Sequence, residues 1–119
     1  MSGKKILIVD DEEDVRMFLK DFLDERDLEV RTARHGVDAL KVLETYEADI
    51  ILLDIMMPEM DGLETLRNIK KKHPKAIVIM ITALKEDGRI EAAQKLGAYN
   101  YIIKPFSLQY LESELSKLL

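Results

Sequence analysis

The chain has 119 residues, enough for one domain with a single sizeable core, and its hydrophobic share of 47% is too high for a disordered protein. The absence of cysteine excludes disulfides and thiolate chemistry, and a formal net charge of −5 argues against direct nucleic-acid binding. No apolar run approaches membrane-spanning length and the N-terminus has no signal-peptide pattern, so we expect a cytoplasmic protein without membrane insertion.

Short apolar runs alternate with amphipathic stretches along the chain. A predicted strand over residues 5–9 precedes a helix with the apolar stripe Val15, Phe18, Leu19, Phe22 and Leu23. A strand over 28–32 precedes a helix with the stripe Ala39, Leu40 and Leu43. A strand over 49–53 precedes a helix that carries Leu63, Leu66 and Ile69.

The second half of the chain continues the alternation. A strand over 76–81 precedes a helix with Ile90, Ala93 and Leu96, which Gly97 is expected to end. A strand over 99–103 precedes the last helix, for which Ser107 is the expected N-cap and the stripe is Leu108, Leu111, Leu115 and Leu118. No linker, repeat or low-complexity segment interrupts the pattern, so we expect a single domain over residues 1–119.

Strict alternation of strands and helices predicts an α/β fold with parallel strands and right-handed crossovers. We predict a doubly wound five-stranded parallel sheet of order 2-1-3-4-5, the (βα)₅ flavodoxin-like arrangement. In this order the winding reverses between strands 1 and 3, and ligands bind at the carboxyl ends of those strands.

Carboxylates stand at both of these strand ends. Asp10 and Asp11 follow the first strand, and Asp54 follows the third. Three clustered carboxylates resist folding unless a cation or a proton neutralises them, which favours a functional site. Oxygen ligands without a thiolate or a nearby imidazole suit Mg²⁺, which commonly binds together with a phosphate group.

Two further strand ends carry groups that suit a phosphoryl ligand. Thr82 ends the fourth strand with a hydroxyl, and Lys104 ends the fifth with an ammonium. Simpler interpretations remain open for each residue taken alone. Asp10 and Asp11 would also suit a helix start, Thr82 an ordinary strand end, and Lys104 a solvated position. We interpret Glu12, Glu13 and Asp14 as solvated residues that cap the first helix, and His35 and His73 as surface residues.

Four motifs in order resemble the receiver domain of two-component response regulators, of the chemotaxis-regulator type. They are Val-Asp-Asp at 9–11, Leu-Leu-Asp-Ile-Met-Met-Pro-Glu-Met-Asp-Gly at 52–62, Ile-Thr-Ala at 81–83 and Lys-Pro-Phe at 104–106. One motif follows each of strands 1, 3, 4 and 5, and the resemblance covers essentially the whole chain.

The resemblance implies a role for each site residue. Asp54 would accept a phosphoryl group from a sensor histidine kinase, a histidine phosphotransfer protein or a small acyl phosphate. Mg²⁺ would be held by Asp10, Asp11, Asp54 and the backbone carbonyl of Met56. Lys104 would bind a phosphoryl oxygen. The remaining implied features are the switch residues Thr82 and Tyr101, a cis bond before Pro105 and a turn at Gly62.

The resemblance also implies that phosphorylation of Asp54 switches a face of the protein. This face is formed by helix 4, strand 5 and helix 5, around Tyr101. Tyr101 could equally be packed core or rim.

We expect the start of helix 1, with Met17 exposed, and the 56–58 loop to dock the phosphoryl donor. The output target is not evident from the sequence, and a phosphorylation-dependent dimer stays open. Apolar Met56 and Leu84 flank the site and predict slow self-dephosphorylation, because neither can orient water.

Two other functions are compatible with this site. One is a Mg²⁺-dependent phosphatase-like enzyme that forms an aspartyl phosphate, although Met56 stands where such enzymes carry a second acid. The other is a degenerate receiver used only for binding, which the complete set of key residues disfavours. We therefore expect a signalling module that catalyses only its own phosphorylation and dephosphorylation and is not otherwise an enzyme.

Overall fold

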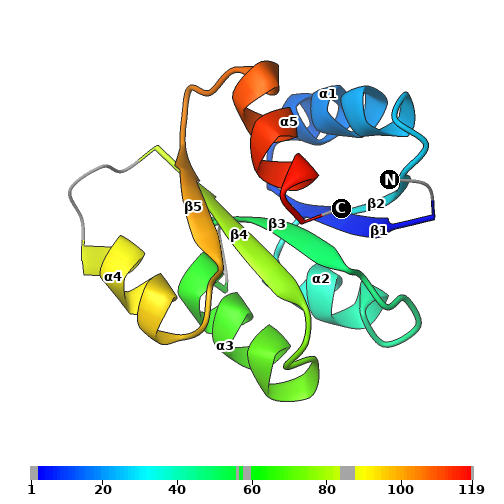
Figure 1. The fold of residues 1–119 in the computed structure, drawn as a ribbon. Helices are drawn as coiled ribbons and strands as arrows, with labels where there is room; N and C mark the ends of the chain where they lie inside the picture. The colour runs from blue at the N-terminus through cyan, green and yellow to red at the C-terminus, as the bar shows by residue number, and fades with distance from the viewer. Residues whose placement is uncertain (1–2, 56, 58–59, 84–87, 119) are drawn as a thin grey trace.

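The computed structural model describes residues 3–55, 57, 60–83 and 88–118, in which strands and helices alternate throughout (Figure 1). The elements are β1 Lys5–Val9, α1 Glu13–Asp24, β2 Glu29–Ala33, α2 Gly36–Val42, β3 Ile50–Asp54, α3 Gly62–Lys72, β4 Ile77–Thr82, α4 Gly88–Lys95, β5 Asn100–Ile103 and α5 Leu108–Ser116. Each predicted element is present. β2 to β5 begin one residue later than expected, a normal uncertainty for boundaries set by local pattern.

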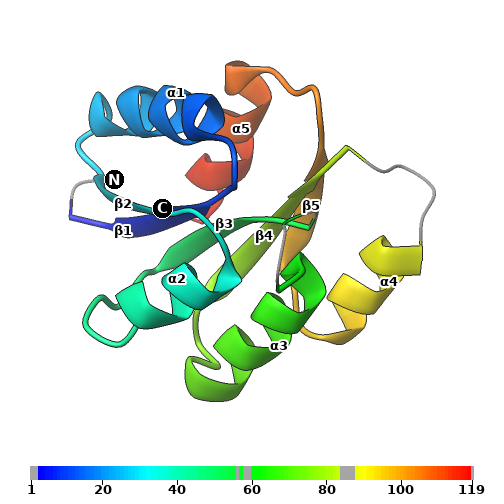
Figure 2. The ribbon, with the colours of Figure 1, turned by 180° about the vertical axis from the view of Figure 1, so that it is seen from behind.

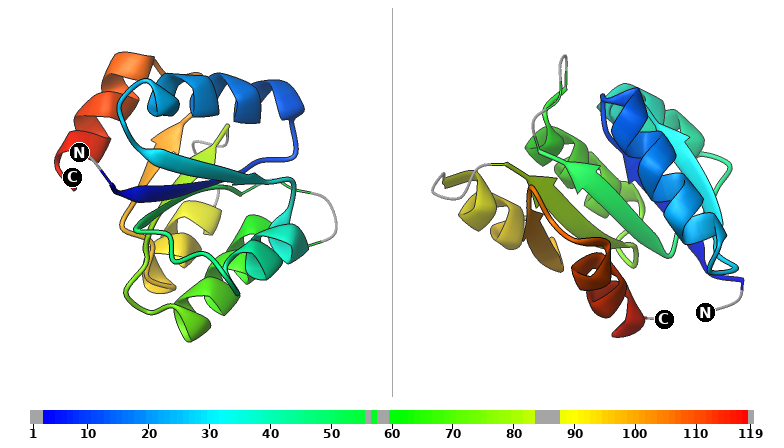
Figure 3. Two further views of the ribbon diagram at one scale, coloured as in Figure 1. Left: turned by 90° about the vertical axis from the view of Figure 1, so that its right-hand side faces the viewer. Right: turned by 90° about the horizontal axis from the view of Figure 1, so that it is seen from above.

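The strands form one parallel sheet in the order β2-β1-β3-β4-β5, which confirms the doubly wound topology. In the register, Val9 of β1 lies opposite Leu53 of β3, and Thr82 of β4 lies opposite Ile103 of β5. The carboxyl ends of these strands therefore share one edge of the sheet (Figure 3).

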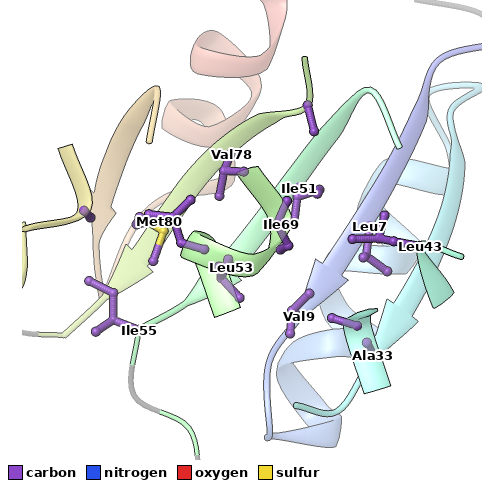
Figure 4. Close-up of a cluster of buried hydrophobic side chains, with 14 of the residues drawn as sticks. Leu7, Val9, Ala33, Leu43, Ile51, Leu53, Ile55, Ile69, Val78 and Met80 are labelled. Atoms are coloured by element: carbon purple, nitrogen blue, oxygen red, sulfur yellow. The ribbon is translucent and has the colours of Figure 1, made fainter. Parts of the chain in front are cut away.

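Helices cover both faces of the sheet. Figures 1 and 2 show α1 and α5 on one face and α2, α3 and α4 on the other. Successive strand residues point to opposite faces, so Ile6 and Ile8 pack beneath α1 and α5, whereas Leu7 and Val9 join the cluster beneath α2 and α3 (Figure 4). All of β3 is buried, which explains its unbroken aliphatic sequence.

The predicted stripe of α1 is wrong in one position. Leu19 and Leu23 are buried, but the side chain of Phe18 is 58% exposed. Phe18 is one residue from Leu19, which is a rotation of about 100° on a helix, so the sheet covers only one of the two. Met17 is 54% exposed, as predicted.

Within the part of the chain that the structure describes, side chains cap three helices. Asp61 accepts a hydrogen bond from the backbone N–H of Glu64 at the start of α3, and Ser107 accepts one from Tyr110 at the start of α5, as expected for Ser107. His35 caps α2 through Nδ1. Gly97 follows α4 with a φ of 102°, which confirms it as the helix stop.

Within the described residues, none of the helices combines the length and the apolar character needed to cross a membrane.

Candidate functional site

Two buried carboxylates and one ammonium meet at the carboxyl edge of the sheet. Asp10, after β1, is 2% exposed, and Asp54, the last residue of β3, is 5% exposed. Nζ of Lys104, after β5, lies 3.1 Å from Oδ2 of Asp10 and 3.5 Å from Oδ2 of Asp54. Among the described residues, Lys104 thus offsets the charge of both acids, which helps the fold to tolerate them.

The pKa of Lys104 reflects this arrangement. Burial by itself lowers the pKa of the ammonium, but the charges of Asp54 and Asp10 and their hydrogen bonds outweigh burial and raise it above the ordinary lysine value. Lys104 is therefore a permanent cation at neutral pH.

Asp11 and Glu12 extend the acidic site towards solvent. Both are exposed, and carboxylate oxygens of Asp10, Asp11 and Glu12 all lie within 4.8 Å of one another. Glu12 occupies the N-cap position of α1 but makes no side-chain capping hydrogen bond, so our interpretation of it as a simple cap is incomplete. The position of Glu12 directly after Asp10 and Asp11 in the sequence could have indicated that it belongs to the acidic site. These hard oxygen donors fit Mg²⁺.

Gly62 sets the position of the β3 end. Its N–H donates to the carbonyl of Ile55 over 2.8 Å. A Cβ at this position would lie 2.5 Å from the carbonyl oxygen of Asp54 and 2.5 Å from Cα of Ile55. Only glycine allows this approach, which agrees with the predicted turn.

The other predicted site residues lie at the neighbouring strand ends. Thr82 is fully buried, and its carbonyl accepts a 2.7 Å hydrogen bond from the N–H of Lys104. The Lys104–Pro105 peptide bond is cis, as expected. Tyr101 is half-buried and packs against the cluster beneath α2, α3 and α4. Met56 and Leu84 lie outside the described residues, and so do Pro58 and Glu59 of the loop after β3.

An apolar groove adjoins this site on the α1 side. It is lined by residues from α1, from the end of β4 and from the segment after β5, namely Asp14, Val15, Phe18, Leu19, Ala83, Lys104, Pro105 and Phe106. Phe18, which the helical pattern placed in the core, instead forms one wall of this groove.

The fold and site together define a doubly wound α/β protein with an acid and lysine centre at the carboxyl edge of its sheet. Residues 6–116 match the family model described as the response regulator receiver domain. The chain therefore belongs to the receiver-domain family of two-component response regulators.

Individual relatives agree with this assignment. The chemotaxis protein CheY of Listeria monocytogenes is 42% identical over 95% of this chain and 96% of its own length. The transcriptional regulatory protein PhoP of Bacillus subtilis is 36% identical over 98% of this chain but only 49% of its own length. The chain thus resembles both small chemotaxis proteins and one part of larger transcription regulators.

Solved structures show the same fold. Response regulator TrrA from Thermotoga maritima, solved in complex with Mg²⁺-BeF, has a TM-score of 0.87 at 38% identity, covering 98% of this chain and 99% of its own. A two-component response regulator from Clostridium difficile reaches a TM-score of 0.93 at 28% identity, covering 98% of this chain and 95% of its own.

Proposed function

We propose that this protein accepts a phosphoryl group on Asp54 and uses it to switch a signalling surface. The observation that carries the proposal is the pairing of Asp54 Oδ2 with Lys104 Nζ at 3.5 Å, beside the buried carboxylate of Asp10. A carboxylate nucleophile next to a fixed cation suits phosphoryl transfer, because negative charge develops on the transferring group.

The chemistry is a single displacement at phosphorus. A carboxylate oxygen of Asp54 attacks the phosphorus of a phosphohistidine or an acyl phosphate, and the bond from phosphorus to the donor breaks. The electron pair leaves with the donor. Lys104 stays protonated, since its pKa is raised, and offers its ammonium to a phosphoryl oxygen.

Mg²⁺ would be held by Asp10, Asp11 and Asp54, and by the backbone carbonyl of Met56 as the resemblance implies. When bound, it supplies further neutralisation of the phosphoryl oxygens. The grouping of the Asp10 and Asp11 carboxylates within 4.8 Å supports this assignment, and Glu12 adds a third acid nearby. The T. maritima relative solved with Mg²⁺-BeF gives independent support.

The switch is proposed to pass through Thr82 and Tyr101 to the face formed by α4, β5 and α5. Thr82 lies at the sheet edge shared with Lys104, and Tyr101 belongs to the next strand. A phosphoryl group adds charge and acceptor oxygens at Asp54, to which a hydroxyl and an ammonium can respond. A dimer that forms on phosphorylation would use the same face, and light scattering before and after phosphorylation tests it.

The phosphoryl donor is proposed to dock in the apolar groove beside the site. Met17 and Phe18 are more than half exposed on α1, and Phe18 lines the groove together with Pro105 and Phe106. Aromatic side chains next to a reactive group are typical anchors for a partner protein. We therefore infer that a histidine kinase or histidine phosphotransfer protein contacts α1 and the segment after β5, together with the 56–58 loop.

Incubation with Mg²⁺ and acetyl phosphate tests the function. We expect one acid-labile phosphoryl group per chain by mass spectrometry, absent in Asp54→Asn and absent when Mg²⁺ is chelated. Steady turnover of added phosphomonoesters would instead favour the phosphatase-like alternative. No adduct with any acyl phosphate or phosphohistidine donor would overturn the proposal.

A further inference from the structure

The residue Arg16 contacts the candidate metal site without using any of its carboxylate oxygens. Arg16 lies in the first turns of α1, and its Nη1 donates a 2.7 Å hydrogen bond to the backbone carbonyl of Asp10. Its own N–H donates to the carbonyl of Glu12 over 3.1 Å. The second bond is an ordinary backbone bond of the helix start, so the guanidinium supplies the contact that is specific to Arg16.

Few other hydrogen bonds of the described residues hold this turn in place. Glu12 makes no side-chain capping bond to α1, so the usual means of fixing a helix start is missing. The N–H of Asp10 donates to Ala33 over a long 3.2 Å, and Asp10 Oδ1 accepts from the N–H of Glu12 over 2.9 Å. Loss of the Arg16 contact would leave the Asp10 carbonyl, at the end of a buried strand, without this donor.

The helix dipole makes Arg16 an unfavourable choice at this position. A cation near a helix N-terminus faces the positive end of the dipole, which is unfavourable. The guanidinium offsets this cost through its hydrogen bond to the backbone carbonyl of Asp10. A cation at this place therefore has a specific role and is not simply part of a solvated face.

We propose that Arg16 is a positioning residue for Mg²⁺, because it fixes the Asp10 to Glu12 turn through the backbone. The proposal rests on the proposed function, in that it assumes Mg²⁺ binds at Asp10 and Asp11. Lys104 also contacts Asp10 but occupies Oδ2, an atom that a metal would use. Arg16 bonds the carbonyl and takes up neither carboxylate oxygen itself. A side chain that holds the backbone of a metal ligand in this way orients the ligands without competing for the ion.

Calorimetric titration with MgCl₂ tests the proposal, because electrostatics and positioning predict opposite results. Removing a nearby cation by Arg16→Gln should tighten Mg²⁺ binding if Arg16 acts only through its charge. We expect weaker binding, by about tenfold, as is usual when an outer-shell partner of a metal ligand is lost. Arg16→Lys, which keeps the charge and one donor, should recover part of the loss.

Lys20→Gln is the matched control. Lys20 lies one turn further along α1 in an exposed pair with Asp24, so this variant removes the same charge from the same helix without touching Asp10. We expect it to change Mg²⁺ affinity by less than about twofold. Amide hydrogen exchange of Glu12 without metal should accelerate in Arg16→Gln and not in Lys20→Gln.

Unchanged or tighter Mg²⁺ binding by folded Arg16→Gln overturns the proposal. If that variant does not fold, Arg16→Met decides by the same titration, since unchanged or tighter Mg²⁺ binding by this variant, which keeps no donor, would overturn the proposal equally. Failure of the unmodified protein to bind Mg²⁺ at all would instead contradict the metal assignment of the proposed function.

Discussion

Lys104 pairs with Asp10 across the carboxyl edge of the sheet, with 3.1 Å between Nζ and Oδ2, although the two residues are 94 positions apart in the chain. The same ammonium also compensates Asp54. This shared cation gives the site its first testable property, because removing it leaves two buried acids facing one another.

Lys104→Met should lower the free energy of unfolding by about 3 kcal/mol in the absence of Mg²⁺. Urea unfolding at neutral pH measures the loss, and added Mg²⁺ should restore part of it by neutralising the same carboxylates. Lys20→Met, which breaks an exposed pair, should cost less than about 1 kcal/mol. Equal losses in the two variants would show that Lys104 contributes no more than a surface ion pair.

Gly62→Ala should both destabilise the fold and slow phosphorylation of Asp54. The added methyl group would collide with backbone atoms of Asp54 and Ile55 at 2.5 Å, so the β3 end must shift. We expect a loss of about 2 kcal/mol by thermal unfolding and a clear fall in the rate of adduct formation with acetyl phosphate. Gly88→Ala is the control, because no atom of the described residues lies within 4 Å of its Cβ position and α4 begins there.

Tyr46 should be the last tyrosine to ionise. Burial, and secondarily the charge of Glu29, raise its pKa from 10.0 to about 12, and its hydroxyl donates to the carbonyls of Ile6 and Glu29. Since the folded-state pKa exceeds the unfolded one, this contribution to stability is complete below pH 10 and is lost as the pH rises to about 12.

Ultraviolet titration combined with urea unfolding checks this prediction. The alkaline loss from Tyr46 should amount to at most about 3 kcal/mol and should disappear in Tyr46→Phe. Lys104 acts in the same direction, because its pKa is also raised and its ion pairs are lost as it deprotonates. An unchanged alkaline slope in Tyr46→Phe would assign the whole effect to other groups.

Phe18→Ala should separate partner docking from chemistry. The side chain is 58% exposed, so the free energy of unfolding should change by less than about 0.5 kcal/mol. Phosphotransfer from a cognate histidine donor should slow by about tenfold or more, while phosphorylation by acetyl phosphate stays the same. Val37→Ala, an exposed apolar position on α2, is the control for a general loss of surface hydrophobicity.

Autodephosphorylation should be slow because the residues two positions after Asp54 and Thr82 in the sequence are apolar. Met56 and Leu84 lack a group to orient the attacking water, so a variant carrying Met56→Asn and Leu84→Glu should lose its phosphoryl group faster. Decay of the radiolabelled adduct gives the two half-lives. A longer half-life in the variant would contradict this explanation.

The sequence alone determined the architecture and the identity of the residues at the site edge. Aliphatic runs of strand length and helical stripes are local patterns, and alternation of the two permits few topologies. Once the strands are parallel, their carboxyl ends must share one edge. Asp10, Asp54, Thr82 and Lys104 could therefore be assigned to that edge before their contacts were known.

Tertiary structure alone decided which of these side chains touch and which helical residues stay exposed. The periodicity of α1 does not distinguish Phe18 from Leu19, because both lie on the apolar side of the helix and only the position of the sheet selects one. The reach of Arg16 to the Asp10 carbonyl, and of one ammonium to two acids, also depends on how helices and strand ends meet in space. Local sequence pattern reflects backbone periodicity, whereas these contacts arise from packing between segments that are distant in the chain.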